Sequence, residues 1–84
     1  MLQEVGLIMR RVLDVLNNTK SKNIVIKLGS KLGGRILFEG DISKCFVHCG
    51  MGLLECQCKV TYSDSEEIYV SIYKESFEEV YLND

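Results

Sequence analysis

The 84-residue sequence contains no proline, no tryptophan and a single histidine, and every apolar stretch in it is short. Without proline, none of the helices and strands expected below is interrupted by a residue that lacks a backbone N–H. No apolar run approaches the ~20 residues that span a bilayer, so we expect no membrane partner. Because His48 is the only histidine, a cysteine nucleophile would have one candidate base and no evident third group to orient it, and we expect no enzyme.

The residues that are present have the composition of one small globular domain. Apolar residues make up 46% of the chain, which excludes a disordered tail, and we expect a single domain over residues 1–84. A domain of this size buries about 60–65% of its unfolded surface, which leaves little room for a deep, dry active site. The net charge of −2 excludes the strongly basic balance of a dedicated nucleic-acid binder, so we expect no direct nucleic-acid binding.

The N-terminal residues are not typical of an export signal. Residues 1–16 are largely apolar, but four charged residues interrupt them, and the pair Arg10 and Arg11 lies in the middle of the stretch instead of before it. We therefore expect a cytoplasmic protein whose four cysteines stay reduced.

Apolar periodicity predicts a helix followed by a hairpin. Apolar residues recur at helical spacing over residues 2–16, and Asn17 and Asn18 favour a helix end. The alternating, β-branched stretch 23–28 and the returning stretch 35–39 flank a glycine-rich turn, which indicates a β-hairpin.

Two short helical segments and a second hairpin complete the expected elements. Asp41 is placed to cap a helical turn through Cys45 and Phe46. A polar turn separates the alternating stretches 55–62 and 68–73, and residues 74–84 have the spacing of a short terminal helix. In the first of these stretches, the residues expected to share one face are Cys56, Cys58, Val60 and Tyr62.

These elements predict an α+β domain, with an N-terminal amphipathic helix packed on a four-stranded, mainly antiparallel sheet and a short C-terminal helix. One helix can cover only one face of such a sheet. The residues expected on the uncovered face are Val25, Leu37, Tyr69 and Tyr73. Either the terminal segment folds over this face through Phe77 and Tyr81, or another chain does.

Charge is divided unevenly along the chain. Residues 1–44 hold eight basic and four acidic side chains, whereas residues 61–84 hold seven acidic side chains and Lys74. The acidic third is either a solvated face that keeps the protein soluble or a surface for a basic partner. The partner would be another protein with a basic surface or, in a homodimer, the basic half of a second copy. The candidate contact residues are Glu67, Tyr69, Tyr73, Glu75, Glu78 and Glu79.

The cysteines raise the question of a metal. Five soft ligands fall within fourteen residues: Cys45, His48, Cys49, Cys56 and Cys58. Zinc prefers thiolate and imidazole ligands, so a zinc-stabilised interaction module is one interpretation. The spacing is unlike that of the usual paired ligands, and Cys56 and Cys58 fit the inward face of a strand. We therefore favour core cysteines and expect no cofactor.

The glycine segment offers a second alternative. Lys31 and Arg35 flank glycines whose N–H groups are able to hold an anion. This arrangement would suit an oligomeric sponge for a phosphorylated small ligand, with both side chains contacting phosphates at a subunit boundary. The segment lacks the Gly-Lys-Ser/Thr order of a phosphate loop, and a hairpin turn accounts for the glycines.

The hydrophobic spacing resembles that of short proteins encoded in prophages and mobile elements of Gram-positive bacteria. The matching stretches are Ile24-Val25-Ile26, the run from Ile36 to Asp41, and the two strands from Val60 to Ile72, so the resemblance covers about residues 19–73. Such proteins often bind and block a host protein, for example a CRISPR nuclease, and others sequester signalling nucleotides. A structural subunit of a phage particle is a further interpretation that the sequence does not distinguish from an inhibitor. The resemblance therefore implies a non-enzymatic, counter-defence inhibitor in the cytoplasm of a bacterial host.

Overall fold

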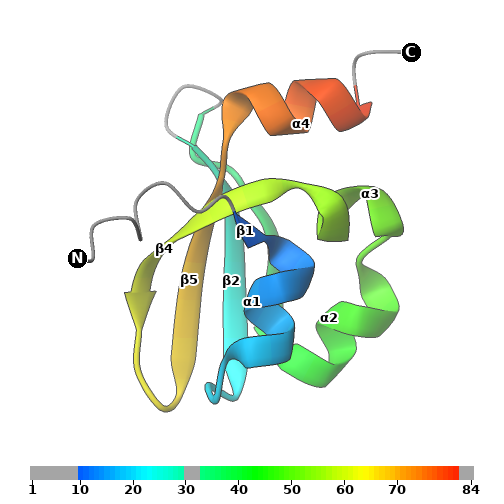
Figure 1. The fold of residues 1–84 in the computed structure, drawn as a ribbon. Helices are drawn as coiled ribbons and strands as arrows, with labels where there is room; N and C mark the ends of the chain where they lie inside the picture. Colours follow the sequence, from blue (N-terminus) through cyan, green and yellow to red (C-terminus); the bar gives the residue numbers. More distant parts are fainter. Residues whose placement is uncertain (1–9, 30–32, 82–84) are drawn as a thin grey trace, which may run out of the picture.

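The computed structural model describes residues 10–29 and 33–81, and within them the chain forms five strands and four helices (Figure 1). In chain order they are β1 (Arg10–Arg11), α1 (Val12–Asn18), β2 (Asn23–Leu28), β3 (Ile36–Asp41), α2 (Ile42–His48), α3 (Met51–Glu55), β4 (Gln57–Ser63), β5 (Glu67–Ile72) and α4 (Lys74–Tyr81). The α+β class predicted from the sequence is confirmed.

The strands form one mixed sheet in the order β1-β4-β5-β2-β3. Both predicted hairpins are present, because β2 pairs antiparallel with β3 and β4 pairs antiparallel with β5. The inner strands of the two hairpins, β2 and β5, lie side by side and run parallel, with Asn23 opposite Glu67 and Leu28 opposite Ile72. The prediction of four mainly antiparallel strands is therefore corrected to five strands with a parallel centre.

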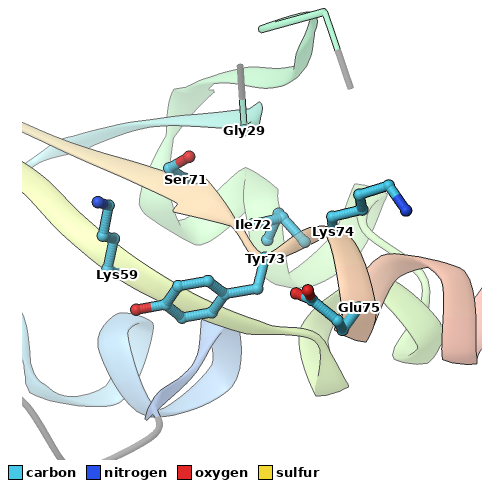
Figure 2. A pocket seen from close by; sticks show the side chains of 7 residues that line it. All are labelled: Gly29, Lys59, Ser71, Ile72, Tyr73, Lys74 and Glu75. Carbon is cyan, nitrogen blue, oxygen red and sulfur yellow. The ribbon is translucent and has the colours of Figure 1, made fainter. Parts of the chain in front are cut away.

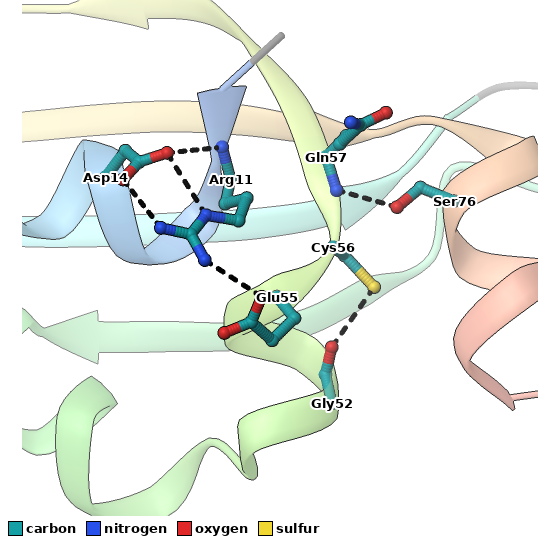
Figure 3. Close-up of polar contacts among 7 residues, drawn as sticks. All are labelled: Arg11, Asp14, Gly52, Glu55, Cys56, Gln57 and Ser76. Carbon is teal, nitrogen blue, oxygen red and sulfur yellow. Dashed lines mark hydrogen bonds and ion pairs between the residues drawn. The ribbon is translucent and has the colours of Figure 1, made fainter.

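The N-terminal helix also differs from the prediction. Residues 1–9 lie outside the described part of the chain, and Arg10 and Arg11 form a short strand on β4 instead of a helical turn. The helix begins at Val12, because pairing with β4 takes both arginines out of it. Arg11 caps this start: its backbone N–H donates to Asp14 at 3.1 Å, and its guanidinium forms ion pairs with Asp14 and, at 2.9 Å, with Glu55 (Figure 3).

The helical segment after Asp41 is longer than predicted. The Asp41 carboxylate accepts a hydrogen bond from the Ser43 N–H at 2.8 Å, which confirms the expected cap. Helix α2 continues past Phe46 to His48, and α3, which the sequence analysis did not predict, follows it. Together α2 and α3 carry the chain from the first hairpin to the second.

The hydrophobic core lies between the sheet and the first three helices, which cover one face of it (Figure 1). The central strands contribute the fully buried side chains of Ile24, Ile26, Val70 and Ile72. The helices contribute Val12, Val15, Leu16, Cys45, Leu53 and Leu54. None of the helices in the described part of the chain has the length and apolar character needed to cross a bilayer.

Helix α4 lies across one end of the sheet (Figure 1). Its residues Phe77 and Val80 pack against the core cluster, and the Ser76 hydroxyl accepts a hydrogen bond from the Gln57 N–H at 2.7 Å (Figure 3). The alternative in which Phe77 covers the opposite face of the sheet is therefore wrong. The Tyr81 side chain, named in the same alternative, lies outside the described part.

Candidate functional site

The candidate site is the sheet face that α1, α2 and α3 leave uncovered, which we call the open face. By strand register its residues include Val25, Lys27, Glu39, Lys59, Tyr62, Tyr69 and Ser71. Val25 and Tyr69 are direct partners across β2 and β5, which places both on the face where the alternation predicts them. Val25 is almost wholly buried between Glu39 and Tyr69, its two cross-strand neighbours.

Leu37 does not belong to this face. The pairing of β2 with β3 shifts register between Ile26, which is opposite Phe38, and Lys27, which is opposite Ile36. Leu37 has no partner in β2 and is therefore an extra residue in β3. Leu37 packs against the core cluster, whereas Ile36 is 51% exposed. The expected place of Leu37 on the uncovered face is thereby corrected, and the reason is a β-bulge.

A second bulge adds Tyr62 to the open face. Val60 is opposite Val70 on the core side, but Tyr62 is then opposite Tyr69 because Thr61 is the extra residue. The predicted common face for Val60 and Tyr62 is therefore wrong. The rings of Tyr62 and Tyr69 make a T-shaped contact, with centroids 5.7 Å apart and planes at 84°, and Tyr62 is 52% exposed.

Carboxylates hold both tyrosine hydroxyls. The Tyr62 hydroxyl donates to Asp64 at 2.6 Å, and this hydrogen bond raises the pKa of Tyr62. The negative charge of Glu67, which accepts from the Tyr69 hydroxyl at 3.2 Å, raises the pKa of Tyr69. Asp64 also accepts from the N–H groups of Glu66 and Glu67, and its pKa is lowered, first by Tyr62 and then by these two donors. The aromatic pair is thus oriented and lies in an acidic setting.

The six predicted contact residues fall into separate groups. Glu67 and Tyr69 lie together on β5, and Tyr73 follows the other end of that strand with Glu75 beside it. Glu75 and Glu79 are exposed on α4, one turn apart. The Glu78 carboxylate is 2.8 Å from the Lys74 ammonium, so part of its charge is balanced within the helix.

Two lysines mark the other end of the open face. Lys27, Ser71 and Lys59 are direct partners on β2, β5 and β4, so the serine hydroxyl lies between two cationic side chains. Beside this row is a depression of about 350 Å³ lined by Gly29, Lys59, Ser71, Ile72, Tyr73, Lys74 and Glu75. Figure 2 shows the Tyr73 ring reaching toward Lys59, while the Lys74 side chain points away from it. The Lys74 ammonium forms its ion pair with Glu78.

The cysteines do not gather into one site. The Sγ atoms of Cys45 and Cys49 are 3.2 Å apart, whereas Cys56 donates to the Gly52 carbonyl at 3.4 Å (Figure 3). His48 is exposed at the end of α2. Across residues 10–29 and 33–81, no three histidine, cysteine or acidic side chains are arranged to hold a metal ion.

The alternative phosphate site at the glycine segment is only partly described. Arg35 is exposed just before β3, and Lys31 lies outside the described residues. Gly33 and Gly34 have φ angles of 94° and 64°, which glycine adopts readily, so the turn geometry explains their presence without a ligand.

Comparisons with protein-family models, with curated proteins and with solved structures find no match for this chain. The site is therefore interpreted from its own residues. Sequence reasoning missed Tyr62 and the cationic row of Lys27 and Lys59. Strand alternation predicts that Lys59 and Cys58 point to opposite faces of the sheet. The row arises only because β2 pairs with β5, which places Lys27 next to Ser71 and Ser71 next to Lys59.

Proposed function

We propose that this protein is a non-enzymatic inhibitor that binds another protein and occupies part of its surface. The single observation that carries the proposal is the Tyr62–Tyr69 pair, in which Tyr62 is exposed and Tyr69 is half-buried. Asp64 and Glu67 hold the pair in place on a sheet face that the described helices leave open. Tyrosine offers a large contact area at a low cost in conformational entropy, which is why it is enriched in protein interfaces.

The charges around the pair favour a partner with a basic surface. Asp64, Glu67 and Glu39 lie around the two rings, and carboxylates in this setting repel nucleic-acid phosphates while attracting lysine and arginine side chains. Glu75 and Glu79 supply further exposed negative charge on α4, at the other end of the sheet and beside the row of Lys27 and Lys59. The resemblance of residues 19–73 to mobile-element proteins suggests a bacterial host protein as this partner.

The thiols of Cys45 and Cys58 favour a binding role over a catalytic one. Burial, and then the hydrogen bond with Cys49, raises the pKa of Cys45 to about 12, and burial raises that of Cys58 to about 12 as well. A catalytic cysteine needs the opposite shift, because the thiolate is the nucleophile.

A capture experiment with matched variants tests the proposal. The wild-type protein, a Tyr62→Ser/Tyr69→Ser variant and a Val47→Ser variant are immobilised and exposed to a lysate of the cells that encode the chain. Val47 is 79% exposed on α2, so its variant removes an apolar side chain from the other side of the molecule. Urea denaturation first confirms that all three are folded.

We expect a protein that wild type and Val47→Ser retain and that the double tyrosine variant loses. Purified, that protein should bind wild type at least tenfold more tightly than the double variant, a difference of about 1.4 kcal/mol. A partner lost on Val47→Ser but kept by the tyrosine variant would place the binding surface on the helical side and refute the proposal. Capture of no protein with the expected pattern would refute it too.

A second candidate function is the binding of a small phosphorylated ligand, and the row of Lys27, Ser71 and Lys59 favours it. In the described residues neither lysine has an ion-pair partner, and the depression beside Lys59 is large enough for a phosphate group and an attached ring. Titration with inorganic phosphate and with adenosine monophosphate, on wild type and Lys27→Gln/Lys59→Gln, tests it. Equal, millimolar-range or absent binding to both proteins would exclude this function.

A further inference from the structure

The strongest unassigned feature is a pair of thiols at the end of α2. Cys45 is fully buried, Cys49 is 9% exposed, and their sulfur atoms are 3.2 Å apart. All four cysteines of the chain lie in its described part, and all four are free thiols. Only the contact between Cys45 and Cys49 joins two of these sulfurs through a hydrogen bond.

The backbone geometry at this place is compatible with a covalent bridge. Residues one helical turn apart have Cα atoms about 6 Å apart, which lies inside the range of about 4.4–6.8 Å found for disulfides. Within a helix the two Cβ directions are fixed, but Cys49 is the C-cap and has left the helix, with φ −85° and ψ 132°. Its side chain therefore has the freedom to close the gap between the sulfurs.

The two thiols also differ in their access to solvent. Cys49 is the more exposed, so a small reagent meets it first. Cys45 keeps its proton at neutral pH, because burial and the hydrogen bond with Cys49 raise its pKa to about 12. The order of reaction follows from this difference, with Cys49 as the attacking thiol and Cys45 as the resolving one.

We propose that Cys45 and Cys49 form a dithiol site that closes to an intramolecular disulfide by exchange with a low-molecular-weight disulfide such as oxidised glutathione. The Cys49 thiolate attacks one sulfur of the reagent, which forms a mixed disulfide and releases one glutathione thiolate. Cys45 then loses its proton and attacks the Cys49 sulfur, which forms the Cys45–Cys49 bond and releases the second glutathione. Both cysteines are oxidised and the reagent is reduced to two glutathione thiols. The two protons lost by the cysteines are taken up by these two thiols, so the reaction balances.

The position of the bridge gives it a structural consequence. Cys49 and Gly50 are the only residues between α2 and α3, so a bond from Cys49 to Cys45 fixes the start of this connection. The exposed apolar side chains of Val47 and Met51 lie on either side of it in the sequence. Oxidation therefore changes the surface formed by α2 and α3 and leaves the open face unaltered. The inference about this dithiol site does not rest on the proposed function of the open face.

Peptide mapping of the native protein tests the bridge without any substitution. Purified protein is incubated with oxidised glutathione, free thiols are blocked with iodoacetamide under denaturing, non-reducing conditions, and the chain is cleaved after lysine and glutamate. Cleavage after Lys44, Glu55 and Lys59 places Cys45 and Cys49 in one peptide and Cys56 and Cys58 in another. The two pairs are thereby read separately in the same sample.

We expect the peptide with Cys45 and Cys49 to lose two hydrogen atoms and to take up no iodoacetamide, while the other peptide is alkylated twice. The rate of closure should rise about tenfold per pH unit near neutrality, because Cys45 must lose its proton. A link that joins the two peptides, or an unreacted Cys45–Cys49 pair in native protein when the unfolded chain oxidises readily, would overturn the proposal.

Variants and a second probe supply the controls. Cys49→Ser removes the attacking thiol and should stay free of any bridge, whereas Cys56→Ser keeps the pair and should behave as wild type. Phenylarsine oxide binds two adjacent thiols without oxidising them, so wild type and Cys56→Ser should each take up one equivalent and Cys49→Ser none. Equal uptake by Cys49→Ser and wild type would show that other thiols form the site and would contradict the inference.

Discussion

At the residue scale, the Ser76 hydroxyl joins α4 to the rest of the protein through a backbone contact. The side chain is buried and its oxygen accepts from the Gln57 N–H, at the start of β4 (Figure 3). When a donor shielded from water loses its acceptor, the loss of stability is larger than the net contribution of an average hydrogen bond, because no water molecule replaces the acceptor. This single oxygen therefore has a large effect for its size.

Ser76→Ala is expected to lower the free energy of unfolding by about 1–3 kcal/mol, because the Gln57 N–H is left without a partner. Urea denaturation measures the change, with an unaltered slope as the sign that only stability has changed. Ser65→Ala, at an exposed turn residue, is the control and should stay within about 0.5 kcal/mol of wild type. Equal stability of the two variants would show that the contact contributes nothing.

The buried thiols predict how stability responds to high pH. The ordinary thiol pKa is 9.0, and burial raises the pKa of Cys58 to about 12. Above pH 9.0 the unfolded chain loses this proton while the folded protein keeps it, so the folded state is favoured less as the pH rises toward 12.

We therefore expect the ionisation of Cys58 to have no effect on the free energy of unfolding below pH 9. Between about pH 9 and pH 12 it should lower this free energy by about 1.4 kcal/mol per pH unit for each buried thiol. Urea denaturation of wild type and Cys58→Ala at a series of pH values isolates this contribution from the tyrosines. The variant should show the smaller fall. Parallel pH profiles for the two proteins would contradict the prediction.

At the scale of the element, the two strands of the first hairpin have very different packing. Strand β2 lies between β5 and β3, and its Ile26 is fully buried, whereas β3 is an edge strand whose Ile36 is 51% exposed. The same residue type thus occupies a core position and a surface position within one hairpin.

Ile26→Ala should lower the free energy of unfolding by about 2–5 kcal/mol, since it removes buried methyl groups and leaves a cavity. Ile36→Ala should change it by about 0.5 kcal/mol or less. Urea denaturation of both variants provides the comparison. A similar loss for both would mean that β3 is packed as tightly as β2, in conflict with the described sheet order.

Most elements could be predicted because their causes are local. The alternation over residues 23–28 and 55–62, the Asp41 cap and the helical spacing after Lys74 each depend on neighbours in the sequence. The parallel pairing of β2 with β5 joins residues more than forty positions apart, and the pairing of Arg10 and Arg11 with β4 is similarly distant. Hydrophobic spacing carries no information about which strands become neighbours.

The candidate site was predictable to the extent that strand alternation is regular. Simple alternation places Tyr69 on the uncovered face, and the structure has it there. The same alternation places Tyr62 on the opposite face, because it does not reveal that Thr61 is an extra residue. The contact between Cys45 and Cys49 has the helical spacing of four, but it also depends on where α2 ends.

At the scale of the whole molecule, the uneven charge of the sequence becomes an uneven surface. The protein is a flattened body of 36 × 35 × 21 Å, and α4 adds exposed carboxylates at the end of the sheet next to Tyr73. Charged side chains outside the contact itself steer an oppositely charged partner during its approach and have less effect once it is bound. The α4 carboxylates should therefore act on the rate of association.

A Glu75→Lys/Glu79→Lys variant tests the effect of α4 on association. The binding partner in this test is the protein that the capture experiment identifies. Glu78 is left in place because it is paired with Lys74. The association rate constant, measured by surface plasmon resonance at low salt, should fall by roughly tenfold and lose most of its salt dependence, with little change in dissociation. Glu75→Gln/Glu79→Gln removes half as much charge and should fall between wild type and the reversal. Equal association rates for all three proteins at every salt concentration would show that the α4 carboxylates do not steer the partner, and would contradict this prediction.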